Sequence, residues 1–192
     1  MRDTSIQQVY ETRVLKALTH SVRRRILDIL KVEGPMTVGQ LAEATDQAVG
    51  SISHHMRVLA EAGMIEESPT LARDKRERWW TLTSDDVRWS HSDFADDEHA
   101  VTIFEAVGSL LLDRQMGLVR DWPRMRDQYA PEWRTGCSVS TETWLQLTPD
   151  EARALAAELV ALLERWSAKS GADDEQDRQP VFVFAHSVPA KP

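Results

Sequence analysis

One short stretch of this 192-residue chain combines small, polar and basic side chains at helical spacing. The stretch QAVGSISHHMRVLAEAG (residues 47–63) carries no acidic residue before Glu61. Such a face can approach base edges and phosphates closely, so its chemistry suits contact with DNA. An amphipathic helix without a partner would explain the apolar side of the stretch, but not a polar side so poor in acids. The candidate contacts are Gln47, Gly50, Ser51, Ser53, His54 and Arg57.

A first short helix is predicted ahead of this face, at about residues 38–44. Thr37 and Gln40 fit a capping box, in which each side chain accepts a hydrogen bond from a free backbone N–H group. Thr37 is also a candidate DNA contact.

The second helix, residues 47–62, carries the candidate face. Asp46 is expected to cap its N-terminus, and Gly63 is expected to adopt a left-handed conformation after its end. Helical spacing predicts one apolar stripe along it, made of Val49, Ile52, Met56 and Leu59.

A charged hairpin is predicted after the second helix. Residues 64–68 and 78–82 are expected to be its strands. The tip carries Arg73, Lys75 and Arg76, which suit the phosphate backbone or the minor groove. The alternative is a solvated loop, because two acidic residues dilute the positive charge.

Two helices are predicted upstream, at residues 4–18 and 21–31. Arg23, Arg24 and Arg25 lie at the start of the second. Two interpretations of these arginines are equally good. They contact phosphate groups, or they form a solvated face with ion pairs to nearby acidic residues.

A family resemblance rests on VLKALTHSVRRRILDILKVEGPMTVGQLAEATDQAVGSISHHMRVLAEAGMIEE and the later RERWWTLT. This sequence resembles the ArsR/SmtB-type winged helix regulators over Val14–Thr83, somewhat under half of the chain. Its most specific parts are RRRILDIL, TVGQLAEA and SISHHMRVLAEAGMI. The resemblance implies a homodimer that binds a palindromic operator in double-stranded DNA, usually as a repressor released by a signal. It also places Ser51, Ser53, His54 and Arg57 on the reading surface, and implies that His55 packs rather than reads bases.

The charge is unevenly distributed. Residues 1–83 carry 12 Lys and Arg against 11 Asp and Glu, a net charge of +1. Residues 84–192 carry 11 against 20, a net charge of −9. The negative charge therefore lies mostly outside the predicted DNA-binding domain, where it costs little affinity.

The fold class expected for the whole chain is mainly α with small β elements (α+β). We expect a winged helix-turn-helix domain at residues 1–83, a linker at 84–97, and a dimerisation and effector domain at 98–192. The last begins with a long helix from about Glu98 to Arg120 that has a broad apolar face. The resemblance implies that this helix builds the dimer; the alternative is a core helix within one subunit.

A small α/β C-terminal domain is predicted after this helix. Residues 143–147 and 180–188 are rich in β-prone residues and are expected to be strands. Thr148 and Glu151 form a capping box around Pro149, which predicts a helix to about Ser167.

The aromatic residues of the C-terminal half offer a site for a small-molecule effector. Phe104, Trp122, Trp133 and Trp144 are candidates to line an apolar pocket. The alternative is that these side chains fill a small core.

Metal sensing is not expected, and no cofactor is implied. The TVGQLAEA helix has no cysteine, and thiophilic metals need soft ligands. His91, Asp93, Asp97 and His99 are close in sequence, but their order does not match the family's zinc pattern. A metal-responsive repressor is therefore an alternative only.

Other function classes fit less well. An enzyme is not expected, because the chain has no glycine-rich phosphate loop or nucleophile elbow. A winged-helix protein-interaction module that does not bind DNA is the other alternative, and the net charge of −8 would suit it. The single Cys137 excludes an internal disulfide, and no signal peptide or membrane span is evident, so a cytoplasmic protein is expected.

Overall fold

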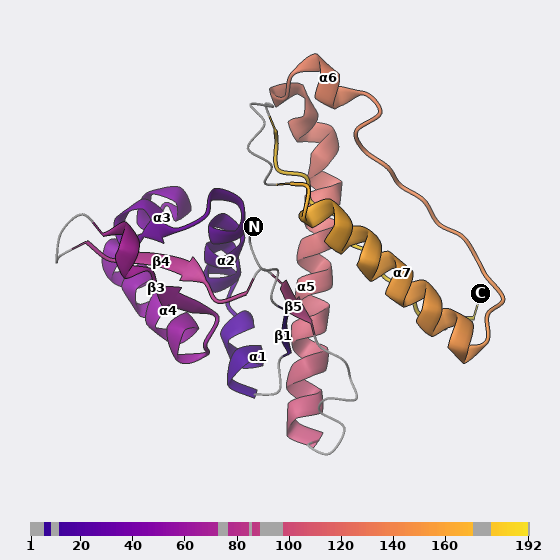
Figure 1. The fold of residues 1–192 in the computed structure, drawn as a ribbon, viewed down its shortest axis with the longest axis horizontal. Helices are drawn as coiled ribbons and strands as arrows, with labels where there is room; N and C mark the ends of the chain where they lie inside the picture. The colour runs from indigo at the N-terminus through magenta and orange to yellow at the C-terminus, as the bar shows by residue number, and fades with distance from the viewer. Residues whose placement is uncertain are drawn as a thin grey trace. The chain divides into compact units, whose positions relative to one another are not determined.

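The computed structural model describes residues 6–8, 12–72, 77–84, 86–88, 98–170 and 178–191 (Figure 1). The chain divides into two compact units, residues 1–112 and 113–192. The boundary falls inside the long helix α5 (Glu98–Met125), so each unit contains part of this helix.

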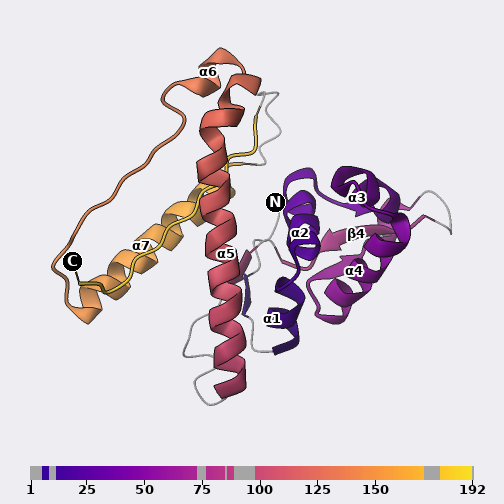
Figure 2. The same ribbon diagram turned by 180° about the vertical axis from the view of Figure 1, so that it is seen from behind.

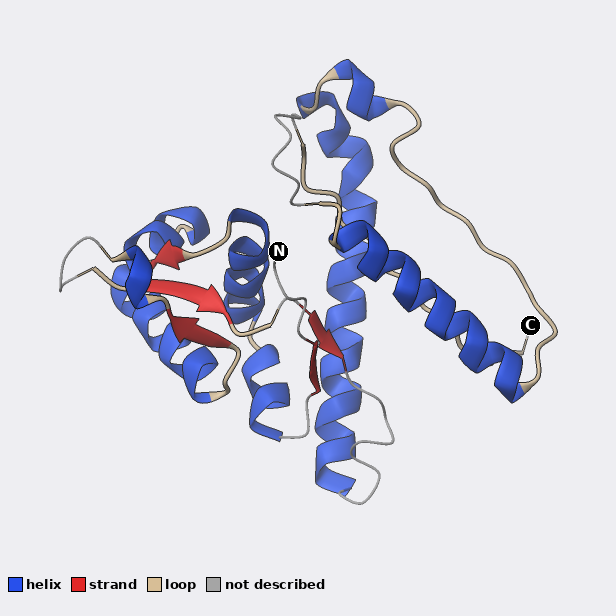
Figure 3. Cartoon of the chain, viewed as in Figure 1, coloured by secondary structure: helices blue, strands red, loops and turns tan. Residues whose placement is uncertain are grey.

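Helices α1 to α4 and a small antiparallel sheet make up most of the first unit (Figure 3). The helices are α1 (Thr12–Leu18), α2 (Ser21–Glu33), α3 (Val38–Thr45) and α4 (Val49–Glu61). The sheet has the order β2–β4–β3, from β2 (Met36–Thr37), β4 (Trp79–Leu82) and β3 (Ile65–Glu67). Because β3 and β4 are the predicted hairpin, the expected winged helix-turn-helix is confirmed.

The N-terminal helix predicted over residues 4–18 is wrong in its first part. Only α1 is helical, and β1 (Ile6–Gln8) is a strand that pairs in parallel with β5 (Asp86–Arg88). Helical spacing of apolar residues cannot reveal this pairing, because the partner strand lies about 80 residues away. The strand β5 also lies within the stretch expected to be a linker.

The capping signals of the helix-turn-helix are confirmed at one helix and corrected at the other. Thr37 Oγ1 accepts a hydrogen bond from the backbone N of Gln40 at 3.3 Å, and Gln40 Oε1 accepts one from the backbone N of Thr37 at 2.8 Å. Asp46 does not cap α4. It ends α3 in a left-handed conformation, with φ 54° and ψ 47°, because the chain must turn sharply there and aspartate tolerates this region. The residue before α4 is Ala48, which makes no side-chain cap.

The core of the first unit lies between α1, α2, α3 and α4. Its fully buried side chains are Leu15, Ile26, Leu41, Ile52, Met56, Leu59 and Val107. The predicted stripe of α4 is therefore correct at its last three positions. It is wrong at Val49, which is 56% exposed because the first turn of α4 projects beyond the core. Val107 shows that the first half of α5 belongs to this core.

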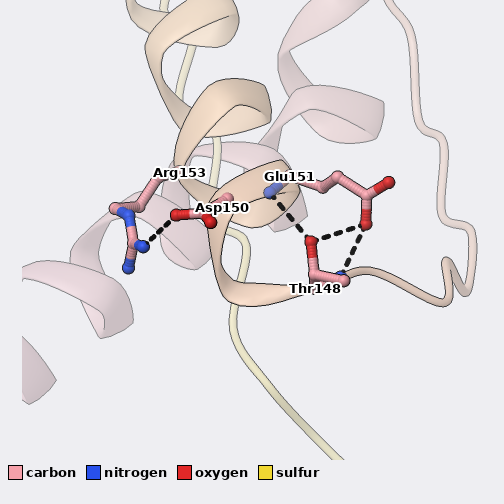
Figure 4. A network of polar contacts seen from close by, with 4 residues as sticks. All are labelled: Thr148, Asp150, Glu151 and Arg153. Atoms are coloured by element: carbon pink, nitrogen blue, oxygen red, sulfur yellow. Dashed lines mark hydrogen bonds and ion pairs between the residues drawn. The ribbon is translucent and has the colours of Figure 1, made fainter.

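The second unit is helical. After α5 come a 3-10 turn (Arg126–Gln128), α6 (Pro131–Arg134) and α7 (Pro149–Ser167). Figure 4 shows the predicted capping box of α7: the backbone N of Thr148 donates to Glu151 Oε2 at 2.7 Å, and the backbone N of Glu151 donates to Thr148 Oγ1 at 3.3 Å. The first of these hydrogen bonds lowers the pKa of Glu151 below its ordinary value. No helix among the described residues is both long enough and apolar enough to cross a lipid bilayer.

The two strands predicted in this unit are not present, so the small α/β C-terminal domain is wrong as a prediction. Residues 143–147 and 180–188 form neither helix nor strand in the structure. Their β-prone side chains favour extended backbone, but a strand also requires a hydrogen-bonded neighbour.

Candidate nucleic-acid interface

Helix α4 separates a buried face from a polar face. Ile52, His55, Met56 and Leu59 are buried, whereas Gly50, Ser53, His54 and Arg57 are exposed and Ser51 is half-buried. The structure thus brings the predicted contacts of α4 together on one side of one helix. The hydroxyl of Ser53 donates to the backbone oxygen of Val49 at 2.9 Å, which leaves its oxygen free to accept.

Gln47 precedes α4 in the turn. It is exposed, and its Nε2 donates to the backbone oxygen of Asp46 at 3.0 Å. An open recess of about 510 Å³ adjoins this turn, and Glu43 and Asp46 are among its lining residues. A phosphate at this recess would meet two carboxylates, so the favourable end of the polar face is the one toward Arg57.

Thr37 is engaged in the structure of the domain. Its hydroxyl accepts from the backbone of Gln40 and donates to Gln40 Oε1 at 2.9 Å. Thr37 therefore has a structural role as the N-cap of α3. A DNA contact by Thr37 remains a prediction.

The tip of the wing lies outside the described residues. Arg73, Lys75 and Arg76 are all in this tip, so their DNA contacts remain predictions. At the base of the wing, Arg78 Nη1 lies 3.2 Å from Glu67 Oε1, an exposed ion pair between the two arms of the hairpin.

Arg23, Arg24 and Arg25 bind backbone carbonyl groups at helix ends. Arg23 donates to the carbonyls of Lys16 and Ala17, and Arg24 Nη1 donates to the carbonyl of Leu18 at 2.7 Å. These carbonyls lie at the end of α1, where a helix leaves its last acceptors without helical donors. The carbonyl of Lys16 also accepts from the Thr19 hydroxyl at 2.8 Å. Arg25 Nη2 likewise donates to the carbonyl of Ala44 near the end of α3, at 2.9 Å. Neither interpretation of the arginine run anticipated this role, because the acceptors come from other helices.

Three histidines meet where α2 and α4 pack. His20 Nδ1 accepts from the backbone N of Val22 at 3.2 Å and so caps α2. The ring of His55 is buried, with its centroid 4.5 Å from that of His20 and 5.7 Å from that of His54. Burial lowers the pKa of His55, and the nearby positive charges of His20, Arg23 and His54 lower it further. His55 is therefore a packing residue with an unusual titration, beneath the exposed His54.

No metal centre is evident in the ranges that the structure describes, which contain no group of three potential ligands. His91, Asp93 and Asp97 lie outside the described residues, and so does the side chain of His99. Cys137 is exposed, and its thiol lies 3.3 Å from the backbone oxygen of Glu132.

The four candidate pocket residues have different surroundings. Phe104 packs against the core of the first unit. In the second unit, the ring of Trp122 contacts that of Tyr129 at 5.4 Å, Trp133 is half-buried, and Trp144 is 68% exposed. An effector pocket built from these residues remains a prediction.

Comparison with known proteins places the helix-turn-helix in a recognised class. Residues 18–68 match a family model described as a helix-turn-helix domain. Transcriptional repressor SdpR of Bacillus subtilis (strain 168) is 44% identical over 54 residues, which cover 28% of this chain and 59% of that protein. The chain thus spans about three-fifths of the length of this relative.

Solved structures with a similar arrangement show weak overall likeness. A possible transcriptional regulatory protein from Mycobacterium bovis is 23% identical with a TM-score of 0.34, covering 52% of this chain and 87% of its own. The C30AH42A mutant of Lactococcus lactis ZitR, in its apo form, is 20% identical with a TM-score of 0.35, covering 79% and 85%.

The sheet order, the buried stripe of α4 and the matched segment define a winged helix-turn-helix domain of the kind found in transcription regulators. The N-terminal part of this chain is such a domain, and a C-terminal extension follows it.

Proposed function

We propose that this protein is a homodimeric, DNA-binding transcriptional repressor. The observation that carries the proposal is the polar face of α4, which is free of acidic residues until Glu61 while the opposite face is buried. A helix of this kind can enter the major groove and present small and basic side chains to base edges. The similarity to the transcriptional repressor SdpR of Bacillus subtilis supports the same role.

The contacts within this proposal fall into two groups. Ser51, Ser53, His54 and Arg57 read the major groove from α4, with Gly50 allowing close approach. Gln47 and Thr37 lie at the margin of this surface. The wing tip, with Arg73, Lys75 and Arg76, contacts the phosphate backbone and fixes the register of the domain on the duplex.

Two copies of the chain are needed to read a palindromic operator. Helix α5 is the proposed dimerisation helix, and it exposes apolar side chains at Leu110 and Leu112 after the position where Val107 enters the core. A two-fold dimer would place its reading helices on half-sites roughly 34 Å apart, one turn of the duplex.

The signal that releases the DNA is proposed to be a small molecule rather than a metal ion. It would act through the C-terminal extension, with Phe104, Trp122, Trp133 and Trp144 as the candidate pocket residues. The second candidate function is a protein-interaction module, which the net charge of −8 favours.

Fluorescence anisotropy tests the proposal. The full chain is titrated into labelled duplex DNA from upstream of its own gene, with a scrambled duplex as competitor and a series of salt concentrations. Selective binding that weakens steeply with salt is expected for a DNA-binding protein, because phosphate contacts release counterions. Absence of selective binding at every salt concentration would contradict the proposal and favour the interaction module.

The affinity of the Arg57→Ala variant for DNA tests whether α4 forms the interface. Removal of a base or phosphate contact is expected to weaken binding by about 1–3 kcal/mol. Arg165→Ala is the matched control, since it removes an exposed arginine from α7 in the other unit. Equal affinities for both variants would place the interface elsewhere.

A further inference from the structure

The second unit lacks a hydrophobic core of its own. Among its described residues, 113–170 and 178–191, none is buried, whereas the first unit buries the apolar side chains around Leu15, Ile26 and Ile52. A folded unit of this length ordinarily buries more than half of the surface that its unfolded chain exposes. The apolar side chains of this unit therefore require another surface to cover them.

An extended segment in this unit contacts α5 through alternating side chains. Phe182, Phe184 and His186 occupy every second position along it. The ring centroids of Phe182 and Phe184 are 5.8 Å apart, and those of Phe184 and His186 are 5.7 Å apart. Two of these side chains contact α5: Arg114 Cζ is 5.7 Å from the Phe182 ring centroid, and His186 Nε2 is 2.9 Å from Gln115 Oε1. Figure 2 shows the segment, in yellow, passing α5 and then running along α7.

Among the described residues, the segment leaves apolar side chains and backbone groups unpartnered. Val181 and Val183 alternate in sequence with the aromatic side chains and are each 59% exposed, and Phe182 is itself 47% exposed. In the described part of the chain, residues 181–190 make no backbone-to-backbone hydrogen bond. The segment thus has the side-chain alternation of a β-strand and the unpaired backbone of a sheet edge, which is a template for an added strand.

The exposed apolar side chains of this unit have a total area comparable with one side of a dimer interface. Trp144 and Trp166 are 68% and 62% exposed, and Leu145 and Val188 are 54% and 75% exposed. With areas of about 150–250 Å² for each aromatic side chain and less for each aliphatic one, the exposed apolar side chains of this unit, which lie on α5, α7 and the segments 139–147 and 181–188, amount in total to roughly 1,000 Å² per chain. A standard interface takes about 800 Å² from each partner.

We propose that the C-terminal unit is completed by a second copy of this chain, with residues 181–187 pairing antiparallel with the same residues of that copy. A two-fold axis makes such pairing self-complementary, because each segment both offers and receives the same edge. The surface is continuous with the proposed dimerisation helix, since α5 enters this unit and exposes Leu118 and Val119 there. The proposal rests on the homodimer proposed above, but not on DNA contact.

Hydrogen exchange of the full chain, combined with analytical ultracentrifugation, tests the pairing. At concentrations where the dimer forms, the amides of residues 181–187 are expected to exchange at least about tenfold more slowly than after dilution to monomer. Fast exchange at every concentration would overturn the pairing. Protection that does not change on dilution would also overturn it, because it would come from docking within one chain.

A variant with added charge provides a second test of the pairing. Val181→Lys with Val183→Lys places two ammonium groups in the paired surface, and is expected to abolish the protection and raise the dimer dissociation constant at least about tenfold. Val139→Lys is the control, at a position that is 90% exposed outside the segment. If the double variant dimerises as the wild type does, the strand pairing is wrong but the homodimer stands. If the wild-type chain itself stays monomeric at every concentration, the homodimer is wrong as well. Anisotropy with Arg57→Ala reports on DNA contact independently of both.

Discussion

The imidazole rings of His20 and His55 lie with their centroids 4.5 Å apart, so that the residue capping α2 packs on the buried histidine of α4. The Nδ1 atom of His55 is buried and has no hydrogen-bond partner among the described residues. This contact connects the helix that carries the arginine run with the helix proposed to read DNA.

The stability of the N-terminal domain is expected to fall on mild acidification. Burial and the nearby charges of His20, Arg23 and His54 lower the pKa of His55 below its ordinary value of 6.5. As pH falls below about 6.5, His55 takes up a proton in the unfolded chain more readily than in the folded chain. The free energy of unfolding therefore decreases. One such group contributes a slope of at most about 1.4 kcal/mol per pH unit. Urea denaturation between pH 7.5 and pH 5 measures it.

His55→Gln removes this titrating group and is expected to flatten the slope. His186→Gln, which removes an exposed histidine of the other unit, should leave it unchanged. An identical pH dependence in the wild type and in His55→Gln would refute the assignment to His55.

Substitution of the buried stripe of α4 should destabilise the domain strongly. Ile52 is fully buried in the core, so Ile52→Ala is expected to cost about 2–5 kcal/mol through reduced burial and the cavity left behind. Val49→Ala lies on the same helix at a 56% exposed position and should cost much less. Chemical denaturation of both variants makes the comparison, and similar losses of stability would mean that Val49 is covered in the assembled protein.

Thr37 provides a test that separates helix capping from DNA contact. Thr37→Ala removes the capping box of α3 and is expected to lower stability by about 0.5–2 kcal/mol. Thr37→Ser keeps a hydroxyl that can cap, so it should retain most of the stability. Anisotropy well below the unfolding temperature then isolates binding. A large loss of affinity in Thr37→Ser with normal stability would show that the threonine methyl group contacts DNA.

The wing is expected to bind phosphate groups of the duplex. Replacing Arg73, Lys75 and Arg76 together with Ala should weaken binding to specific and scrambled duplexes alike. It should also reduce the slope of log affinity against log salt by about 0.9 for each phosphate that is no longer neutralised. An unchanged slope would indicate that the tip is a solvated loop, the alternative that its two acidic residues suggested.

The parts of this protein that could be predicted from sequence are those whose partners are local. The capping boxes at Thr37–Gln40 and Thr148–Glu151 were predicted correctly, because their two members lie three residues apart in sequence. They bind backbone N–H groups that are without a helical partner at the start of every helix. The buried face of α4 was equally accessible, since helical spacing alone places Ile52, Met56 and Leu59 on one side. The DNA contacts themselves remain predictions.

Sequence by itself thus determined the helix-turn-helix, its wing and the direction in which α4 presents its polar face, all of which follow from spacing along one segment. Only the tertiary structure decided that Asp46 ends α3 rather than capping α4, and that Arg23 and Arg25 bind the carbonyl ends of other helices. It also decided that residues 181–187 are extended without a strand partner. Each of these outcomes depends on groups distant in sequence or on a sharp turn between elements, and neither periodicity nor propensity carries that information.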